Sequence, residues 1–150
     1  AKQILAIPLA VTNKLKFDSF YLSSNIPGSA THGFGKPESE GVEFDPTHVQ
    51  GMLGISLDEF VRFSSVRFPN HIKIDVDGIE HIILEGGENI LKIIRGILIE
   101  INDDFKEQAT KVKRYLQDAG LVFDKKLHGK IIEESTAGFA NTYNQIWVRK

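Results

Sequence analysis

The sequence predicts an α/β fold in which a mostly parallel sheet ends in an antiparallel last strand. From residue 69 onward, short apolar runs alternate with longer stretches of helical spacing, which is the pattern of βαβ units. The last two apolar runs are separated only by a loop, so we expect the terminal strand to turn back and run antiparallel.

The first third of the chain predicts two strands and a long loop. Residues 4–11 form a short apolar run, in which Pro8 indicates an edge strand or a bulge, and residues 17–22 form a second candidate strand. Residues 23–49 are rich in Gly, Ser, Pro, Thr and Asn and show no sustained period, so we expect a loop. Loops of this length in a compact domain are often functional, and our hypothesis for this one is a lid.

A short strand and a capped helix follow this loop. Residues 52–56 predict the strand, and residues 57–63 predict the helix. Ser56 is a natural N-cap because Glu59, three residues later, completes the pattern of a capping box.

The second half of the chain predicts a regular alternation of elements. Strands are expected at residues 71–76, 96–101, 121–127 and 145–149, and helices at residues 79–94 and 104–119. We expect Gly86 and Gly87 to break the first of these helices into two pieces. In the second helix Val112 and Leu116 fall at helical spacing, and Gly120 ends it.

The composition is that of a folded globular domain. Hydrophobic residues make up 41% of the chain and charged residues 25%, so disorder is not expected over most of its length. The formal net charge of −2 offers no basic field for nucleic acid. No apolar run approaches the roughly 20 residues that cross a bilayer. The absence of cysteine fits a reducing compartment, and we therefore expect a cytoplasmic protein.

Polar side chains fall at the carboxyl ends of two predicted strands. Asp75 lies near the end of the first strand, with Asp77 just past it. Glu100 lies at the corresponding end of the next strand, with Asn102 just after it. Ligands of open α/β sheets bind beyond the carboxyl ends of strands, so we expect these side chains to meet at one edge. Crowded carboxylates raise one another's pKa and can act as acid, base or metal ligand.

A structural interpretation competes with the functional one at some of these positions. Asp77 followed by Glu80 is an aspartate version of the capping box, and we favour that capping role for the pair. Asp75 is different, because a carboxylate in an apolar strand is costly to bury without a partner, and here we favour function. His81 is expected at the surface or behind the site, and His128 in a solvated loop.

Two other classes of function remain open from these residues. An apolar strand followed by Asp-x-Asp also matches glycosyltransferases, in which paired carboxylates hold a divalent cation against a diphosphate. A metal-dependent glycosyltransferase is therefore one alternative. A non-catalytic scaffold or interaction domain is the other.

Three segments share a combined spacing: SLDEF at residues 56–60, HIKIDVDGIEHIILEGGENIL at residues 71–91 and ILIEI at residues 97–101. With the tail TYNQIWVRK, this spacing resembles that of the FkbM family of methyltransferases. The positions that carry the resemblance are Leu57, Asp58, Ile72, Lys73, Asp75, Gly78, Glu80, Leu84, Gly86 and Glu100. The chain departs from the family pattern at Asp77, where the family usually has Glu.

The resemblance implies a Rossmann-like methyltransferase fold and S-adenosylmethionine as cofactor. It further implies methyl transfer to an oxygen of a small-molecule or glycan acceptor, such as a sugar or polyketide-type hydroxyl. Asp75, Asp77 and Glu100 are then the expected catalytic residues, with Asp75 the first candidate for orienting or deprotonating the hydroxyl. No metal ligand is expected.

The resemblance also implies that part of the domain is absent. Such enzymes hold the cofactor with a strand, a glycine-rich turn and a helix, whereas Gly33 and Gly35 lie in a loop here. We therefore expect residues 1–150 to be one partial domain, the C-terminal part, best matched at residues 51–150 and inactive alone. The N-terminal strands would be missing beside residues 4–11, and the open edge would favour pairing with another copy or with the missing half.

Overall fold

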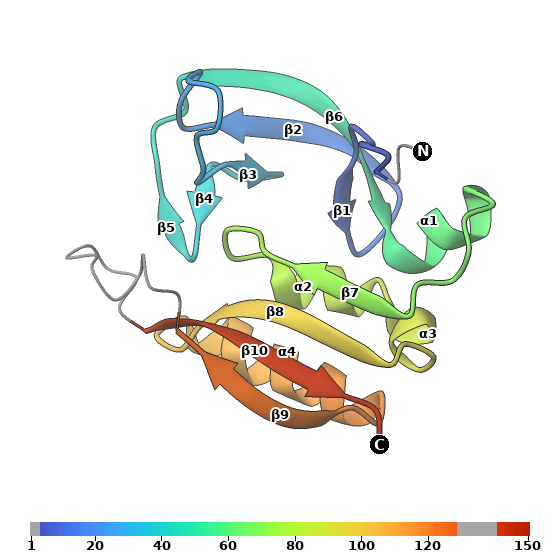
Figure 1. Cartoon of the computed structure of the whole chain (residues 1–150). Coiled ribbons are helices and arrows are strands. Elements are labelled where there is room, and N and C mark those ends of the chain that lie inside the picture. The colour runs from blue at the N-terminus through green and yellow to red at the C-terminus, as the bar shows by residue number, and fades with distance from the viewer. Residues whose placement is uncertain (1–3, 129–140) are drawn as a thin grey trace.

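The computed structural model describes residues 4–128 and 141–150 of the chain. Its elements are β1 (Ala10–Thr12), β2 (Lys16–Leu22), β3 (Gly33–Phe34), β4 (Glu38–Ser39), β5 (Val42–Glu43), β6 (His48–Ser56), α1 (Leu57–Phe63), β7 (His71–Ile74), α2 (Glu80–Glu85), α3 (Glu88–Leu91), β8 (Gly96–Asn102), α4 (Lys106–Asp118), β9 (Val122–Leu127) and β10 (Thr142–Val148). They form a mixed α/β fold with two four-stranded sheets, β1-β6-β2-β3 and β7-β8-β10-β9, and a β4-β5 hairpin (Figure 1).

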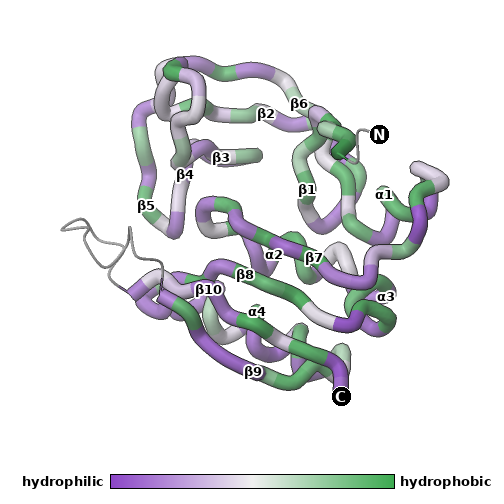
Figure 2. Tube along the Cα trace, viewed as in Figure 1, coloured by the Kyte–Doolittle hydropathy of each residue, from purple (hydrophilic) through white to green (hydrophobic). Residues whose placement is uncertain are grey.

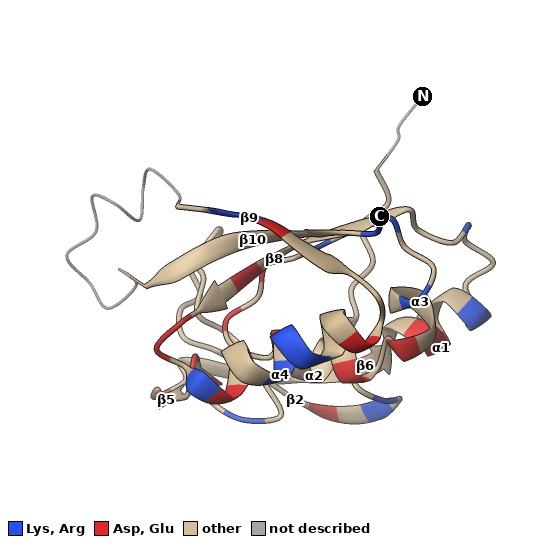
Figure 3. Cartoon of the chain, turned by 90° about the horizontal axis from the view of Figure 1, so that it is seen from below, with Lys and Arg blue, Asp and Glu red and all other residues tan. Residues whose placement is uncertain are grey.

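The second sheet follows the prediction closely. β7 and β8 are parallel, and β10 lies antiparallel between β8 and β9, which confirms the direction of the last strand. The helices α2 and α4 lie on one side of this sheet (Figure 3). Most of the predicted loop between the last two strands lies outside the described residues. None of the helices in the described part is long and apolar enough to cross a membrane.

The first sheet corrects the prediction of a mostly parallel arrangement. Only β1–β6 and β7–β8 pair in parallel among the described strands, whereas β2 and β6 form a long antiparallel pair. No helix connects β2 to β6, and a chain that returns without a crossover pairs antiparallel. Of the strand predicted at residues 4–11, only the end forms a strand, as part of β1 at Ala10–Thr12. Residues 23–49, predicted as a loop, contain β3, β4, β5 and the start of β6.

The hydrophobic core lies between the second sheet and its helices. It is built from Ile74, Ile83, Leu84, Ile90, Leu91, Ile94, Ile97, Ile99, Ile101, Val112, Leu116, Ala119, Leu121 and Trp147. Hydrophobic segments of α3 and β8 are green in Figure 2. Side chains alternate across β8, so three isoleucines face the core while Leu98 and Glu100 lie on the opposite face. The core therefore sets which side of the sheet presents its polar residues.

Gly86 brings the two sheets together. A Cβ atom at this position would lie 2.6 Å from both the Cα of Asn13 and the carbonyl oxygen of Thr12, which follow or end β1. Those two atoms belong to the backbone and cannot rotate away. The break between α2 and α3, predicted from Gly86 and Gly87, is thus the point where the end of β1 contacts the second half of the chain.

Helix α1 is held at its start and against α3. The predicted capping box is confirmed: the amide of Glu59 donates to Ser56 Oγ over 3.2 Å, and the amide of Ser56 donates to Glu59 Oε2 over 3.3 Å. Asp58 accepts hydrogen bonds from the backbone amides of Asn89 and Ile90 at 3.0 and 2.9 Å. These bonds satisfy amides at the start of α3 that no helical carbonyl can reach.

The substitution Gly86→Ala should lower the free energy of unfolding by about 1–3 kcal/mol, because the added methyl group overlaps fixed backbone atoms. The φ of Gly86 is −84°, which any residue adopts, so the effect is steric. Urea-induced unfolding measures it. Lys92→Ala, at the exposed end of α3, is the control and should change stability by less than about 0.5 kcal/mol. Equal stability of the two variants would contradict the close approach.

Candidate functional site

A cavity of about 630 Å³ lies between the two sheets, beside the carboxyl end of β7. Its walls are mainly apolar and come from residues 7–11, from Phe20 and Phe34 of the first sheet, and from the start of α2. Asp75 and Asp77 are the acidic side chains in the wall. Concave, mostly apolar sites with a few converging polar groups are typical of small-molecule binding. This cavity is therefore the candidate site.

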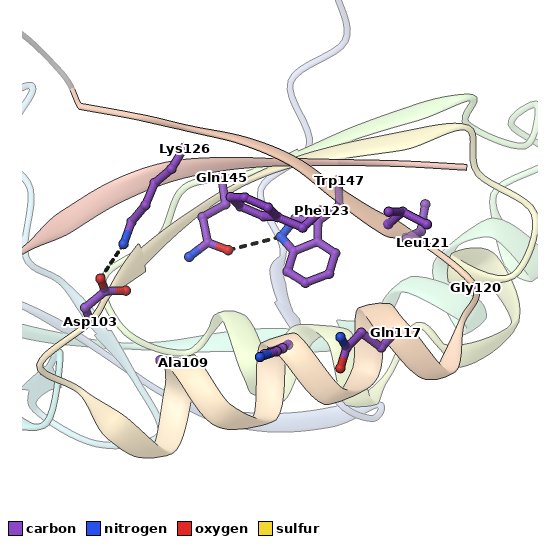
Figure 4. A pocket seen from close by; sticks show the side chains of 11 residues that line it. Asp103, Ala109, Gln117, Gly120, Leu121, Phe123, Lys126, Gln145 and Trp147 are labelled. Carbon is purple, nitrogen blue, oxygen red and sulfur yellow. Dashed lines mark hydrogen bonds and ion pairs between the residues drawn. The ribbon is translucent and has the colours of Figure 1, made fainter. Parts of the chain in front are cut away.

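A second hollow, of about 760 Å³, lies between α4 and the strands β9 and β10 (Figure 4). The rings of Phe123 and Trp147 meet edge to face, with centroids 5.4 Å apart, and the indole of Trp147 donates to Gln145. Asp103, its one acidic side chain, is paired with Lys126. None of the predicted catalytic residues lines this hollow.

Asp75 and Glu100 meet at the ends of adjacent strands. In the parallel register of β7 and β8, they are the next neighbours beyond the last paired positions, and they share the face opposite the core. Asp75 is exposed and Glu100 is half-buried. Burial and the adjoining Asp75 carboxyl raise the pKa of Glu100 to about 7, with smaller contributions from Glu40 and Asp77. The structure thus brings together the carboxylates that the sequence placed at one edge.

Lys73 is the cation beside this pair. It stands two residues before Asp75, on the same face of β7, and forms an ion pair with its carboxylate. Both side chains are well exposed, so solvent screens the attraction and the pair contributes little to stability. Its effect is to orient Asp75 between Lys73 and Glu100.

Asp77 does not cap α2, contrary to our prediction. Its Oδ2 accepts hydrogen bonds from the backbone amides of Thr31 at 2.7 Å and His32 at 3.3 Å, and its carbonyl accepts one from the amide of Glu40 at 3.0 Å. The residue before α2 is Ile79, and no side chain caps that end. Long-range partners have replaced the local ones, so Asp77 ties the segment between β2 and β6 to the end of β7.

Glu80 is also part of a network rather than a capping box with Asp77. Its side chain is 1% exposed; Oε1 accepts from the amide of Val76 at 3.3 Å, and Oε2 accepts from Gln108 Nε2 at 2.5 Å. Gln108 in turn accepts from the amide of Asn102 at 2.9 Å. Burial raises the pKa of Glu80 to about 8, so its carboxyl is mostly neutral at pH 7.

The two histidines considered from the sequence are both packed against aromatic rings. His81 is 7% exposed and meets Phe105 edge to face, with centroids 5.9 Å apart, so a surface position is wrong. Burial lowers the pKa of His81. His128 is partly buried beside Tyr143, with ring centroids 4.8 Å apart, rather than solvated.

The structure adds a carboxylate that the sequence analysis missed. Glu40 lies in the two-residue turn between β4 and β5, and its Oε2 accepts a hydrogen bond from Asn102 Nδ2 at 2.6 Å. The signal available in the sequence was Gly41, which favours a tight turn. That signal predicts a turn but not where the turn lies in the folded chain.

Among residues 4–128 and 141–150, no group of three or more His, Asp or Glu is arranged to hold a metal ion.

A family model, the methyltransferase FkbM domain, matches residues 1–123, from the N-terminal segment into β9. The chain belongs to the FkbM methyltransferase family. The resemblance found in the sequence is thereby confirmed. No curated protein and no solved structure shows a significant match to the chain.

The family pattern includes positions of two physical kinds in this FkbM domain. Asp58 and Gly86 hold α1 and β1 against the α2–α3 break, and Gly78 allows a tight backbone contact. Asp75 and Glu100 instead lie at the ends of strands, on the face opposite the core. A motif that spans both kinds therefore specifies the frame as well as the site.

Glu80 should make the stability of this FkbM domain depend on pH. An unfolded chain ionises Glu80 near 4.5, whereas the folded chain keeps it protonated up to about pH 8. The folded state binds the extra proton between these values, so the stability that Glu80 contributes is highest below pH 4.5. It falls by at most about 1.4 kcal/mol per pH unit as the pH rises toward 8.

The substitution Glu80→Gln should flatten this fall. Urea-induced unfolding between about pH 5 and pH 8 measures the slope. Glu88→Gln, at an exposed position of α3, is the matched control and should keep the parent slope. If Glu80→Gln also kept that slope, the buried carboxyl would not be protonated in the folded chain.

Proposed function

We propose that this FkbM domain takes part in S-adenosylmethionine-dependent O-methylation, with the acceptor hydroxyl bound at the carboxylates that end β7 and β8. The observation that carries the proposal is the Asp75–Glu100 pair beside the cavity between the sheets. A carboxyl with a pKa of about 7 can both accept and release a proton at neutral pH. The family match supports methyl transfer over a glycosyltransferase or a scaffold.

The two sheets are proposed to be parts of one Rossmann-like arrangement. β1 and β7 each lie at the edge of their own sheet, and each is parallel to its inner neighbour. β10 is inserted antiparallel between β8 and β9. Strands placed between β1 and β7 would join both sheets, and residues 1–150 would then be one partial methyltransferase domain. The lack of cysteine supports a cytoplasmic location.

The acidic side chains in the cavity wall fit the positively charged part of S-adenosylmethionine. The cofactor is cationic at its sulfonium, and Asp75 and Asp77 place carboxylates in an otherwise mainly apolar wall. The described residues contain no glycine-rich turn between a strand and a helix, because Gly33 and Gly35 flank Phe34 at the edge of the first sheet. Asp75 and Asp77 are thus the residues that would face the cofactor. When bound, it supplies an electrophilic methyl group.

The chain's own residues act on the acceptor. Asp75 is exposed and can accept a hydrogen bond from an incoming hydroxyl, which orients the oxygen. Glu100 lies beside it and can share or take the proton as the hydroxyl reacts. Asp77 holds the segment between β2 and β6 close to the cavity and so helps to exclude water. A sugar or polyketide-type hydroxyl is the proposed acceptor, by family resemblance.

Asp75→Asn in the active enzyme should lower kcat/KM by at least about 100-fold, because the neutral amide removes the carboxylate that orients the acceptor hydroxyl beside Glu100. Transfer of a labelled methyl group measures the rate, and circular dichroism checks the fold. Asp103→Asn is the matched control, since Asp103 is also a carboxylate in an ion pair with lysine but lies at the other hollow. Full activity of Asp75→Asn would remove this residue from the mechanism.

The pH dependence of the reaction should report Glu100. A base must be ionised, so kcat/KM is expected to be low below the pKa of Glu100, about 7, and to rise through that value. Glu100→Gln should abolish this limb of the profile. The same limb in Glu100→Gln would assign the ionisation to another group.

A further inference from the structure

Glu40 occupies a demanding backbone position at the tip of the β4–β5 hairpin. Ser39 pairs with Val42, which leaves Glu40 and Gly41 as the two turn residues. Their φ angles are 51° and 82°, and a two-residue turn of type I′ needs positive φ at both positions. Glycine, asparagine and aspartate adopt this conformation most readily, whereas glutamate rarely does. The turn therefore carries a glutamate where its backbone favours other residues.

The tip of this hairpin is fixed against the turn that follows β7 (Figure 1). The amide of Glu40 donates to the carbonyl of Asp77 over 3.0 Å. The next residue, Gly78, has a φ of 113°, and a Cβ atom there would lie 2.5 Å from the nitrogen of Glu40. Only a glycine at position 78 permits both the conformation and the contact. The backbone of Glu40 is thus held at the end of β7.

The side chain of Glu40 lies on the face of the sheet that carries Glu100. Its Oε2 accepts the hydrogen bond from Asn102 Nδ2 at 2.6 Å. Asn102 and Glu100 stand two residues apart on β8, so they project from the same face. Asn102 is itself fixed, because it is 6% exposed and its Oδ1 accepts from the amide of Asp104. The half-buried carboxyl of Glu40 is therefore held close to Glu100.

The other groups around Glu100 come from different elements than Glu40. Asp75 comes from the end of β7 and is paired with Lys73, and Asp77 comes from the turn that follows. On the other side, β10 places the neutral Asn144 opposite Glu100. Glu40 is the carboxylate that reaches this face from the first half of the chain, through the hairpin.

We propose that Glu40 is a positioning residue of the site, which fixes the amide of Asn102 and places a further negative charge beside Glu100. The charge of Glu40 helps to raise the pKa of Glu100, whereas burial is the main cause that raises the pKa of Glu40 itself. Glu100 therefore loses its proton in the field of the Glu40 carboxylate. The catalytic meaning of this coupling rests on the proposed function, but the coupling itself does not.

Glu40→Gln tests the coupling, because glutamine keeps the length of the side chain and an oxygen for Asn102 but removes the charge. We expect Glu100, followed by carbon-13 NMR of its carboxyl group, to titrate at a lower pH than in the unsubstituted chain. The acid limb of kcat/KM should move to lower pH with it. Glu43→Gln is the matched control, since Glu43 belongs to β5 of the same hairpin but its side chain is exposed. It should leave both titrations unchanged.

A second pair of variants guards against a fold defect in Glu40→Gln. Asparagine and aspartate are both favoured in type I′ turns and differ here only in charge. Glu100 should therefore titrate at a lower pH in Glu40→Asn than in Glu40→Asp. Equal titration of Glu100 within each pair, Glu40→Gln against Glu43→Gln and Glu40→Asn against Glu40→Asp, would overturn the proposal. In the complete enzyme, a shifted titration of Glu100 without any methyl transfer would keep the coupling and contradict the proposed function instead.

Discussion

The contact at Gly86 is the constraint on which the arrangement of the molecule depends. Because glycine has no side chain, the backbone at the end of β1 can lie against the break between α2 and α3. Asp58 strengthens the same junction by accepting hydrogen bonds from the first amides of α3. Because the first sheet has no comparable apolar core of its own among the described residues, this junction and the segment between β2 and β6 place it beside the second sheet. The cavity between the sheets exists only in that arrangement.

The carboxylates near the carboxyl ends of β7 and β8 are crowded, and crowding like charges costs free energy unless the fold offsets it. The offset takes a different form at each residue. Glu80 is buried and stays mostly protonated, Asp77 accepts two backbone amides, and Asp75 lies beside Lys73. Glu100 has the weakest compensation of the group. Catalytic acids and bases commonly have a pKa that burial and like charges have shifted toward 7.

Two glycines in the family pattern show how the frame and the site are connected. Gly86 joins the sheets, and Gly78 admits the backbone of Glu40 at the end of β7. Both act through the absence of a Cβ atom, and neither touches the cavity through a side chain. A substitution at either position would displace carboxylates without changing any of them. The positions of the family resemblance thus include steric requirements of the backbone at Gly78 and Gly86.

The sequence by itself determined what depends on neighbouring residues in the chain. The capping box of Ser56 and Glu59, the helix break at Gly86 and the strands of the second sheet follow from local patterns. The meeting of Asp75 and Glu100 follows because adjacent parallel strands end at the same edge.

Tertiary structure alone decided the rest. Asp77 binds amides 45 and 46 residues away instead of capping α2, and Glu40 reaches Asn102 from 62 residues away. Short polar strands such as β4 and β5 leave no periodic signal, and burial of Glu80 depends on Gln108 of another helix. Such partners compete with local ones only after the chain has folded, so no local pattern predicts which will prevail.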